Sequence, residues 1–268
     1  MLRICSIGDI VGKAGRTALH QLIPVIQEKY APDVIICNGE NAAGGFGLTK
    51  KIFDEITKKF GVDAVTMGNH WHDKPEILQF APSQPNIILP GNMSNVEDMA
   101  DGLKIITSKT GVRYAVINLI GIAFMKPGNS CPFRAADELI ARIPESVKVR
   151  VLDFHAEATS EKQALAHYVT GRISLFYGTH THTPTADERI FKNHTGFATD
   201  VGMTGAYDSV IGIKKEASLG RFLGEGKKKF EPAKGDPWLC ALIADIDEND
   251  GACKSLERVR LELKDYKN

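Results

Sequence analysis

Residues 33–41 read DVIICNGEN, an apolar run that stops at Asn-Gly-Glu-Asn. Apolar runs of about four to eight residues that end in turn formers are typical of fully buried strands. We find the same pattern at residues 3–7, 64–67, 86–89, 113–118, 148–154 and 173–177. Each of these segments is predicted to be a buried β-strand whose carboxyl end delivers small or polar residues.

Helical patterns separate these strands. Leu19, Leu22, Ile23, Ile26 and Tyr30 keep helical spacing, with Pro24 as a start or kink. Further helices are predicted over residues 50–60 behind an N-cap at Thr49, over 132–142, and over 161–169 behind a Ser160–Gln163 capping box. Alternating strands and helices favour β-α-β units with parallel strands, and therefore an α/β fold.

The C-terminal part has a different pattern. Residues 239–247 and 255–263 read as two strands joined by a turn-rich segment, which predicts an antiparallel ending and mixed sheets. Residues 224–236 are basic and rich in Gly, and we expect a solvated loop there that contains Lys227, Lys228 and Lys229. No linker or internal repeat is evident, so residues 1–268 are predicted to form one domain.

Composition narrows the function classes. Lys and Arg number 33, Asp and Glu also number 33, and the formal net charge is zero. A general binder of nucleic acid or of anionic membranes needs a basic excess, so neither partner is indicated. The sequence has no signal-peptide pattern and no run long enough to span a membrane. We therefore expect a cytoplasmic protein without membrane contact, and the oligomeric state stays open, with a homo-oligomer as one alternative.

The five cysteines are odd in number, scattered, and form no CxxC pair. A disulfide framework or a cysteine-rich zinc site is therefore not expected. Cys5 and Cys37 lie in apolar runs and are predicted to be core thiols.

Polar side chains gather at the ends of the predicted strands. In open α/β sheets, binding sites form outside the carboxyl ends of the strands. The residues at these ends that can bind or react are Asp9, Glu40, Asn41, Asn69, His70, His155, His180 and His182. They offer carboxylate, amide and imidazole groups without a thiolate.

Donors of this kind suit a metal centre. A mixed oxygen and nitrogen site favours Mn or Fe, with Zn or Mg as alternatives. Without His70, these residues offer seven ligands, which is more than one ion needs if it keeps an open position. Two ions bridged by a carboxylate would use all seven. Glu40 is the natural bridge. Two carboxylates leave two divalent ions with excess positive charge, which favours a small anionic substrate such as a phosphoester.

Six motifs carry a family resemblance: GDIVGKAGR at 8–16, NGENAAGG at 38–45, MGNH at 67–70, DFHAEATSEK at 153–162, GTHTHT at 178–183 and TDVGMTGAYD at 199–208. Together they resemble the calcineurin-like metallophosphoesterases, and within them the YmdB-type bacterial metallophosphodiesterases. The resemblance implies a four-layer α/β-β/α sandwich of mixed sheets flanked by helices. It also implies a dinuclear metal-dependent phosphodiesterase that acts on cyclic nucleotides, notably 2′,3′-cyclic forms.

The resemblance also implies residue roles. One metal would be held by Asp9, Glu40, Asn41 and His182, and the other by Glu40, Asn69, His155 and His180. A metal-bridging hydroxide would attack phosphorus, and His70 would donate a proton to the leaving group. Val11 stands where the wider superfamily has a histidine, and Asn41 would compensate. Trp71-His72 replaces a Thr-Trp pair that is common in the subgroup.

Other interpretations of the same residues remain. Asp9 can be a helix cap, Asn41 and Asn69 turn residues, and His70 an eighth ligand. A strand through His180 and His182 would point both rings to one face, where they could also be a core pair. We expect His72 at the rim, residues 200–205 in a loop near it, Gly12 and Gly15 at a helix entry, and His20, His167 and His194 in structural or surface roles.

Alternative activities also stay open at this stage. The chain can be a phosphomonoesterase or nuclease. It can also be a regulatory nucleotide-binding protein with little turnover.

Overall fold

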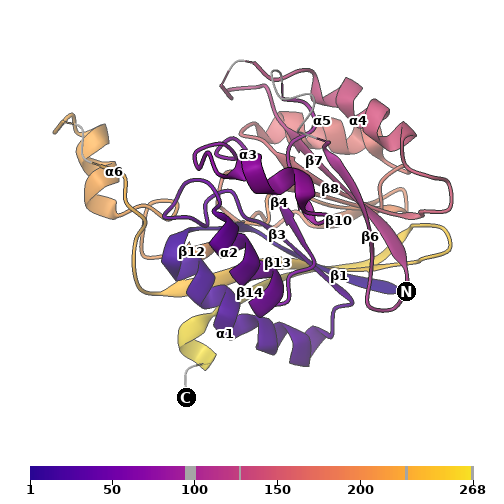
Figure 1. The fold of residues 1–268 in the computed structure, drawn as a ribbon, viewed down its shortest axis with the longest axis horizontal. Helices are drawn as coiled ribbons and strands as arrows, with labels where there is room; N and C mark the ends of the chain where they lie inside the picture. The colour runs from indigo at the N-terminus through magenta and orange to yellow at the C-terminus, as the bar shows by residue number, and fades with distance from the viewer. Residues whose placement is uncertain (94–100, 127, 227–228, 267–268) are drawn as a thin grey trace.

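A computed structural model describes residues 1–93, 101–126, 128–226 and 229–266, and Figure 1 traces their path. Its first sheet has eight strands in the order β2-β12-β13-β1-β3-β4-β5, with β14 paired to β13. The strands are β1 (Leu2–Ile7), β2 (Asp9–Ile10), β3 (Val34–Asn38), β4 (Ala64–Thr66), β5 (Ile87–Ile88), β12 (Met203–Ala206), β13 (Pro237–Ile246) and β14 (Cys253–Glu262).

The second sheet has six strands in the order β10-β11-β9-β8-β7-β6. They are β6 (Leu103–Thr107), β7 (Arg113–Ile120), β8 (Val149–His155), β9 (Leu175–Thr179), β10 (Arg189–Phe191) and β11 (Thr195–Ala198). Both sheets mix parallel and antiparallel pairs. In the first, β1, β3 and β4 run parallel and β13 and β14 are antiparallel. In the second, β7, β8 and β9 run parallel and β6 is antiparallel to β7.

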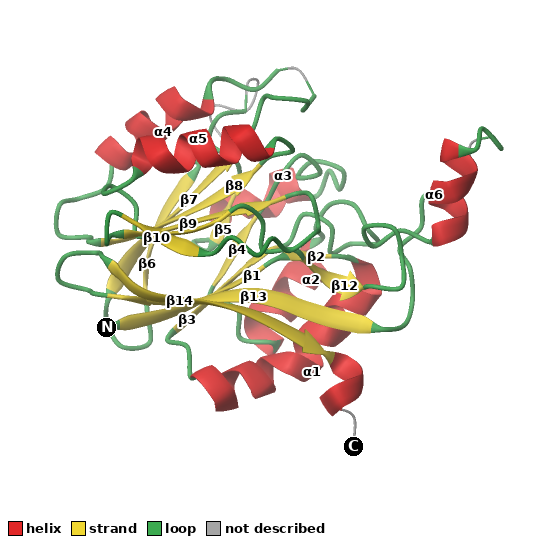
Figure 2. Cartoon of the chain, turned by 180° about the vertical axis from the view of Figure 1, so that it is seen from behind, coloured by secondary structure: helices red, strands yellow, loops and turns green. Residues whose placement is uncertain are grey.

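Helices cover the two outer faces, as Figure 2 shows from the opposite side. α1 (Gly12–Tyr30), α2 (Lys50–Asp54) and the π-helical turn η1 (Glu55–Lys59) flank the first sheet, and α4 (Pro132–Ala141) and α5 (Thr159–Val169) flank the second. The short helices are α3 (Ile77–Phe80), η2 (Ala81–Ser83), α6 (Lys215–Phe222) and η3 (Leu263–Tyr266). The predicted four-layer α/β-β/α sandwich is confirmed.

The alternation of side chains along the strands builds this sandwich. Ile4 packs between the sheets with Val116 and Val151, whereas the adjacent Cys5 faces the helix layer of the first sheet with Leu19. Strand side chains point alternately to opposite faces, so uniformly apolar strands serve two cores at once. This is why the central strands read as continuous apolar runs in the sequence.

Most predicted elements are present, but four local details were wrong. Residues 203–205, expected in a loop, belong to the strand β12. α1 begins at Gly12 and continues through Pro24, so the proline does not start the helix, which was one of the two roles expected for it. The Ser160–Gln163 capping box does not form, because the N-cap of α5 is Ala158 and no side chain caps it. His180 and His182 do not extend a strand, since β9 ends at Thr179.

Other local predictions were confirmed. Thr49 caps α2, where its hydroxyl accepts a hydrogen bond from the Ile52 amide at 3.3 Å. Cys5 and Cys37 are buried free thiols. Of the three lysines predicted in a solvated loop, Lys227 and Lys228 lie outside the described residues, and Lys229 is exposed.

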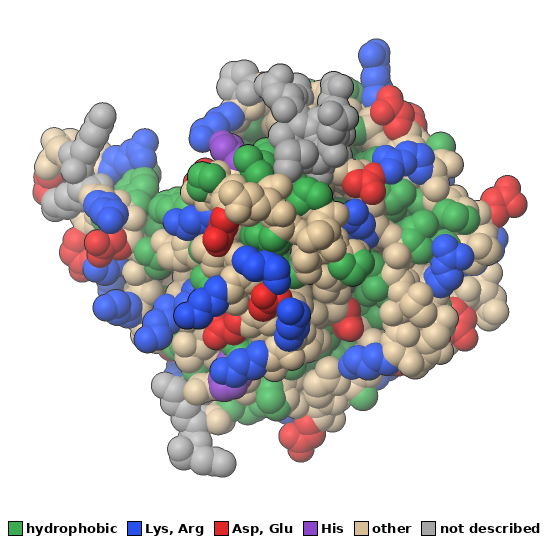
Figure 3. All heavy atoms as spheres, viewed as in Figure 1, with side chains coloured by type: hydrophobic (Ala, Val, Ile, Leu, Met, Phe, Trp, Pro, Cys, Tyr) green, Lys and Arg blue, Asp and Glu red, His purple; other side chains and the backbone are tan. Residues whose placement is uncertain are grey.

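The charged side chains on the described surface are of both signs (Figure 3), in keeping with the zero net charge of the sequence. On the face drawn in Figure 3, basic and acidic side chains are interspersed. Among the described residues, no helix is both long and apolar enough to cross a bilayer.

Candidate active site

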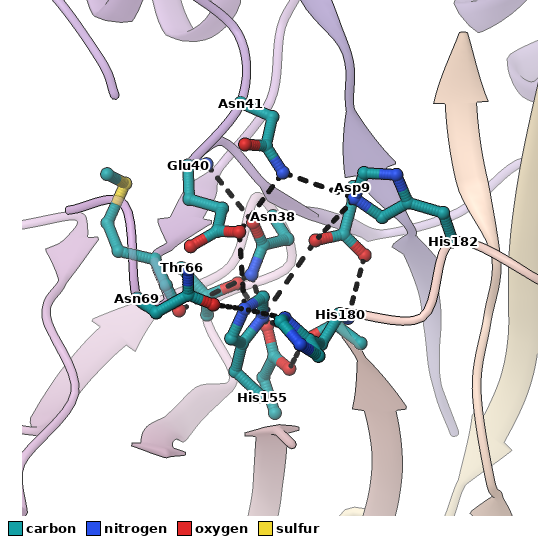
Figure 4. A network of polar contacts seen from close by, with 12 residues as sticks. Asp9, Asn38, Glu40, Asn41, Thr66, Asn69, His155, His180 and His182 are labelled. Atoms are coloured by element: carbon teal, nitrogen blue, oxygen red, sulfur yellow. Dashed lines mark hydrogen bonds and ion pairs between the residues drawn. The ribbon is translucent and has the colours of Figure 1, made fainter. Parts of the chain in front are cut away.

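The carboxyl ends of strands from both sheets meet at one edge of the sandwich. Asp9 follows the end of β1 and begins β2, the segment after β3 carries Glu40 and Asn41, and Asn69 follows β4 at the next turn. From the second sheet, β8 ends in His155, and His180 and His182 follow β9. Figure 4 shows the seven side chains drawn toward one centre, so the structure brings all the predicted ligands together.

One group of donors surrounds His155. Its Nε2 lies 3.2 Å from Glu40 Oε1, 2.9 Å from Asn69 Oδ1 and 3.0 Å from His180 Nδ1. Ligand atoms of Glu40, His155 and His180 lie within 4.8 Å of one another and can hold a metal ion. Carboxylate, amide and imidazole donors gathered in this way are of the kind that suits a cation.

A second group surrounds Asp9. Its Oδ1 lies 3.9 Å from His182 Nε2, and Asn41 Nδ2 lies 3.2 Å from the same nitrogen. Asn41 Nδ2 also donates to Glu40 Oε1 at 3.0 Å, which links the two groups through Glu40. Asp9 Oδ1 is fully buried and has no hydrogen-bond partner. A buried carboxylate oxygen without a donor is costly, and a bound cation would satisfy it.

His70 lies beside this cluster in a different setting. Its backbone N–H donates to Glu40 Oε2 at 2.9 Å, whereas its ring Nδ1 lies 2.8 Å from Asp73 Oδ2. The ring packs edge-on against Phe46 and its side chain is 25% exposed. His70 is therefore anchored to the cluster through its backbone, and its side chain reaches solvent.

The backbone at two histidines differs from the extended form that we expected. His180 has φ +97° and His182 has φ +64°. A strand would place both rings on one face, but the left-handed backbone instead turns each imidazole separately toward the centre. The two rings do turn toward one centre, but the strand expected to carry them there is absent.

The structure also tests the roles that the sequence suggested for Asp9, Gly12 and the other histidines. The N-cap of α1 is Val11, so Asp9 does not cap that helix, and Gly12 starts it with φ +56°. His72 is exposed next to Trp71. His20 packs against Phe60 and His167 stacks on Phe191, while His194 takes part in a backbone hydrogen bond to Cys253; all three fit structural or surface roles.

Comparison with known proteins gives the family. The sequence model of the YmdB-like protein family matches residues 5–259, nearly the whole chain. This chain belongs to the YmdB-like family. The motif resemblance drawn from the sequence is therefore confirmed.

Relatives of this YmdB-like chain are named as phosphoesterases. It is 43% identical over 258 residues to the 2′,3′-cyclic-nucleotide 2′-phosphodiesterase of Bacillus subtilis, with 96% of each chain covered. A solved structure titled a novel phosphatase from Mycoplasma pneumoniae superposes with a TM-score of 0.91 at 31% identity, covering 97% of this chain and 93% of that one. A solved structure of a hypothetical protein from Thermus thermophilus superposes with a TM-score of 0.89 at 35% identity, covering 97% of this chain and 99% of that one. The YmdB-like chain is accordingly a phosphoesterase.

The electrostatics of the cluster favour positive charge at its centre. Burial raises the pKa of the Glu40 carboxyl, but the adjacent His155 outweighs it and the pKa falls to about 2. Burial and the charge of His155 lower the pKa of His180 to about 3, so its imidazole stays neutral. Burial lowers the pKa of His155, yet Glu40 and Asp9 raise it to about 9. The buried carboxylates of this YmdB-like site therefore attract positive charge.

A buried relay fixes how His155 presents its ring. Thr179 Oγ1 donates to Asp153 Oδ1 at 2.8 Å, so its lone pair accepts the Nδ1–H of His155 at 2.9 Å. The other oxygen of Asp153 accepts from Thr66 at 2.5 Å and from Asn38 at 3.3 Å. With its proton on Nδ1, His155 aims the lone pair of Nε2 at the cluster, as a metal ligand requires.

Sequence reasoning missed one feature of this YmdB-like site. Lys162 in α5 is buried and pairs with Asp200, which lies directly behind the His180 loop. A signal was available: Leu165, Ala166 and Val169 form the buried face of α5, and Lys162 stands at helical spacing from all three. A lysine on the apolar face of a helix needs a buried partner.

Proposed function

We propose that this protein is a dinuclear metal-dependent phosphodiesterase that hydrolyses cyclic nucleotides, with 2′,3′-cyclic nucleotides as substrates. The proposal is supported by the Bacillus subtilis relative, whose name states that substrate. It is also supported by the oxygen and nitrogen donors at the strand ends. The observation that carries it is Glu40, whose Oε1 faces both His155 and Asn41 at the junction of two ligand groups.

We assign the ligands as two sets that share Glu40. Asp9, Glu40, Asn41 and His182 would hold one ion, and Glu40, Asn69, His155 and His180 would hold the other. The unpartnered Asp9 Oδ1 and the crowded acceptors around His155 Nε2 fit this assignment. The donor set favours Mn or Fe, because carboxylate and amide oxygens are mixed with imidazoles.

Two divalent ions would supply Lewis-acid stabilisation of the phosphate and an activated water. The protein contributes the remaining elements of catalysis. Asp9 and Glu40 neutralise only half of the charge of two such ions, so an anionic phosphodiester is attracted to the centre. Asn41 and Asn69 bind without adding charge, and this preserves the positive excess.

His70 is proposed as the proton donor. In the doubly protonated ring, Nδ1–H donates to Asp73 Oδ2, at 2.8 Å, and Nε2–H is left for another acceptor. Its backbone amide is anchored on Glu40 Oε2, which keeps the ring beside the metal ligands. Opening a 2′,3′-cyclic phosphate at the 2′ position releases an alkoxide, a poor leaving group that needs a proton as the bond breaks. The product would be a 3′-phosphate.

A phosphomonoesterase is the second candidate, because a structural neighbour with a TM-score of 0.91 is titled a phosphatase. A panel of substrates separates the two activities: 2′,3′-cyclic AMP, 3′,5′-cyclic AMP, a linear dinucleotide and 3′-AMP, each with protein reconstituted with Mn²⁺. We expect the highest kcat/KM for 2′,3′-cyclic AMP, with 3′-AMP accumulating as product. Faster turnover of 3′-AMP than of the cyclic substrate would support the monoesterase instead. A tight nucleotide complex without turnover would favour a binding protein.

A further inference from the structure

A fully buried ion pair lies behind the loop that carries His180 and His182. Lys162 is 0% exposed, and its Nζ donates to Asp200 Oδ2 at 2.8 Å. Asp200, in the segment between β11 and β12, is also buried. Neither side chain belongs to the two proposed ligand sets, and the proposed chemistry assigns no role to either residue.

The other hydrogen bonds of this pair go mainly to the histidine loop. Lys162 Nζ also donates to the carbonyl oxygen of Thr179 at 2.8 Å. Asp200 Oδ2 accepts from the backbone N–H of Thr181 at 3.2 Å and from its hydroxyl at 2.8 Å. The ion pair therefore holds the residues on both sides of His180.

This loop needs such support because its backbone is strained. The φ values of +97° at His180 and +64° at His182 lie where side chains other than Gly are rarely found. Conformations of this kind persist only where the surroundings determine them, and they gather at functional sites. The loop has other restraints as well: His180 N–H donates to Asp9 Oδ2 at 3.2 Å, and His182 Nδ1 donates to the Ile211 carbonyl at 2.7 Å.

The end of β9 is shaped to admit the lysine. A Cβ placed on Gly178 would lie 2.8 Å from Lys162 Cδ and 1.9 Å from the Thr199 carbonyl oxygen. Only glycine leaves room for the lysine stem to cross the strand and reach the Thr179 carbonyl. Burying an ion pair is a poor route to stability, because apolar residues of similar volume often do as well or better. These observations favour a role in positioning.

We propose that the Lys162–Asp200 ion pair is a positioning device that holds the Thr179–Thr181 backbone so that His180 and His182 face the metal centre. The inference rests on the proposed function, in which both histidines are metal ligands. Groups that orient metal ligands typically change metal affinity by about 10–100-fold when they are removed.

The test replaces the pair by apolar residues of matching shape. In the double variant Lys162→Met/Asp200→Leu, apolar side chains of similar size replace both charged ones and no charge is left unpaired. The control is Arg3→Met/Asp245→Leu, which removes a partly exposed 2.6 Å ion pair between β1 and β13, away from the proposed metal ligands. For each protein, Co²⁺ affinity is measured by competition with a chromophoric chelator, together with the Tm and the visible absorption of bound Co²⁺.

We expect the double variant to keep a cooperative thermal transition, bind Co²⁺ about 10–100-fold more weakly and show an altered Co²⁺ spectrum. The control should bind Co²⁺ as the unmodified protein does. Unchanged Co²⁺ affinity and spectrum in a folded double variant would overturn the inference. If the double variant does not fold, Thr181→Val removes one Asp200 contact at a partly exposed position, and undiminished Co²⁺ affinity there would equally overturn it. Failure of the unmodified protein to bind Co²⁺ would count against the proposed function itself.

Discussion

His155 Nε2 lies 3.2 Å from Glu40 Oε1, although the two residues come from different sheets. Glu40 follows β3 of the first sheet, and His155 ends β8 of the second. Packing the sheets face to face thus brings together a carboxylate and an imidazole that are far apart in the chain. The proposed metal centre is a product of the sandwich itself, and its residues should respond differently to substitution according to their positions in it.

The first prediction compares Glu40 with Asn41. Glu40→Gln should deplete both metal positions, because Glu40 is shared by both ligand sets and supplies one of their two carboxylates. Asn41→Ala removes a neutral ligand from one set and should weaken only that position. Elemental analysis of both variants after identical Mn²⁺ reconstitution measures the difference. Near-normal metal content in Glu40→Gln would remove Glu40 from the bridging role.

The second prediction concerns His70. Its side chain contacts Asp73 and Phe46, so His70→Ala should leave the metal content close to normal. Turnover of 2′,3′-cyclic AMP should fall by about 10²–10⁴-fold, the range for a general acid or base. A diester with a nitrophenolate leaving group should be affected much less, because that group departs without a proton. The measurement is kcat/KM on both substrates.

Two results would contradict this role of His70. Equal losses on both substrates would argue against proton donation. Loss of a metal ion from the variant would instead make His70 a ligand.

The third prediction concerns the hydroxyl that fixes the His155 ring. Thr179→Val keeps the side-chain shape but removes the acceptor of the His155 Nδ1–H. We expect metal affinity to fall by about 10–100-fold, and stability to fall by about 1–3 kcal/mol because buried polar atoms lose partners. Chelator competition and chemical unfolding measure the two effects.

Thr195→Val is the matched control. Thr195 is also buried in the second sheet, where its hydroxyl donates to the Ile173 carbonyl at 2.6 Å. Its loss should destabilise the protein to a similar degree while metal affinity stays unchanged. Parallel losses of affinity in both variants would show that Thr179 acts only through stability.

Local sequence patterns predicted the strand ends well. An apolar run such as residues 33–37, followed by Gly and polar residues, is set by nearby sequence alone, and it placed Glu40 and Asn41 correctly at a carboxyl end. The motifs at five such ends then pointed to one site, because parallel neighbouring strands share an edge.

Features that depend on distant contacts were not predicted. The two-residue strand β2 exists because it pairs with β12, about 190 residues further along the chain. The left-handed backbone at His180 is held by Asp9 and Asp200, and the HTH spacing suggested an ordinary strand. β6 and α6 were not predicted either. Apolar and polar residues alternate only weakly in Leu103–Thr107, and Lys215–Phe222 lacks a strong apolar face.

The central claim, a phosphodiesterase that works with two metal ions, is tested most directly by one titration. Metal-free protein receives Mn²⁺ in increments while the hydrolysis of 2′,3′-cyclic AMP is followed, and bound metal per chain is measured at each point. We predict that activity rises steeply only as the second equivalent binds and that it levels off near two ions per chain. Full activity at one ion per chain, or undiminished activity in the metal-free protein, would contradict the account.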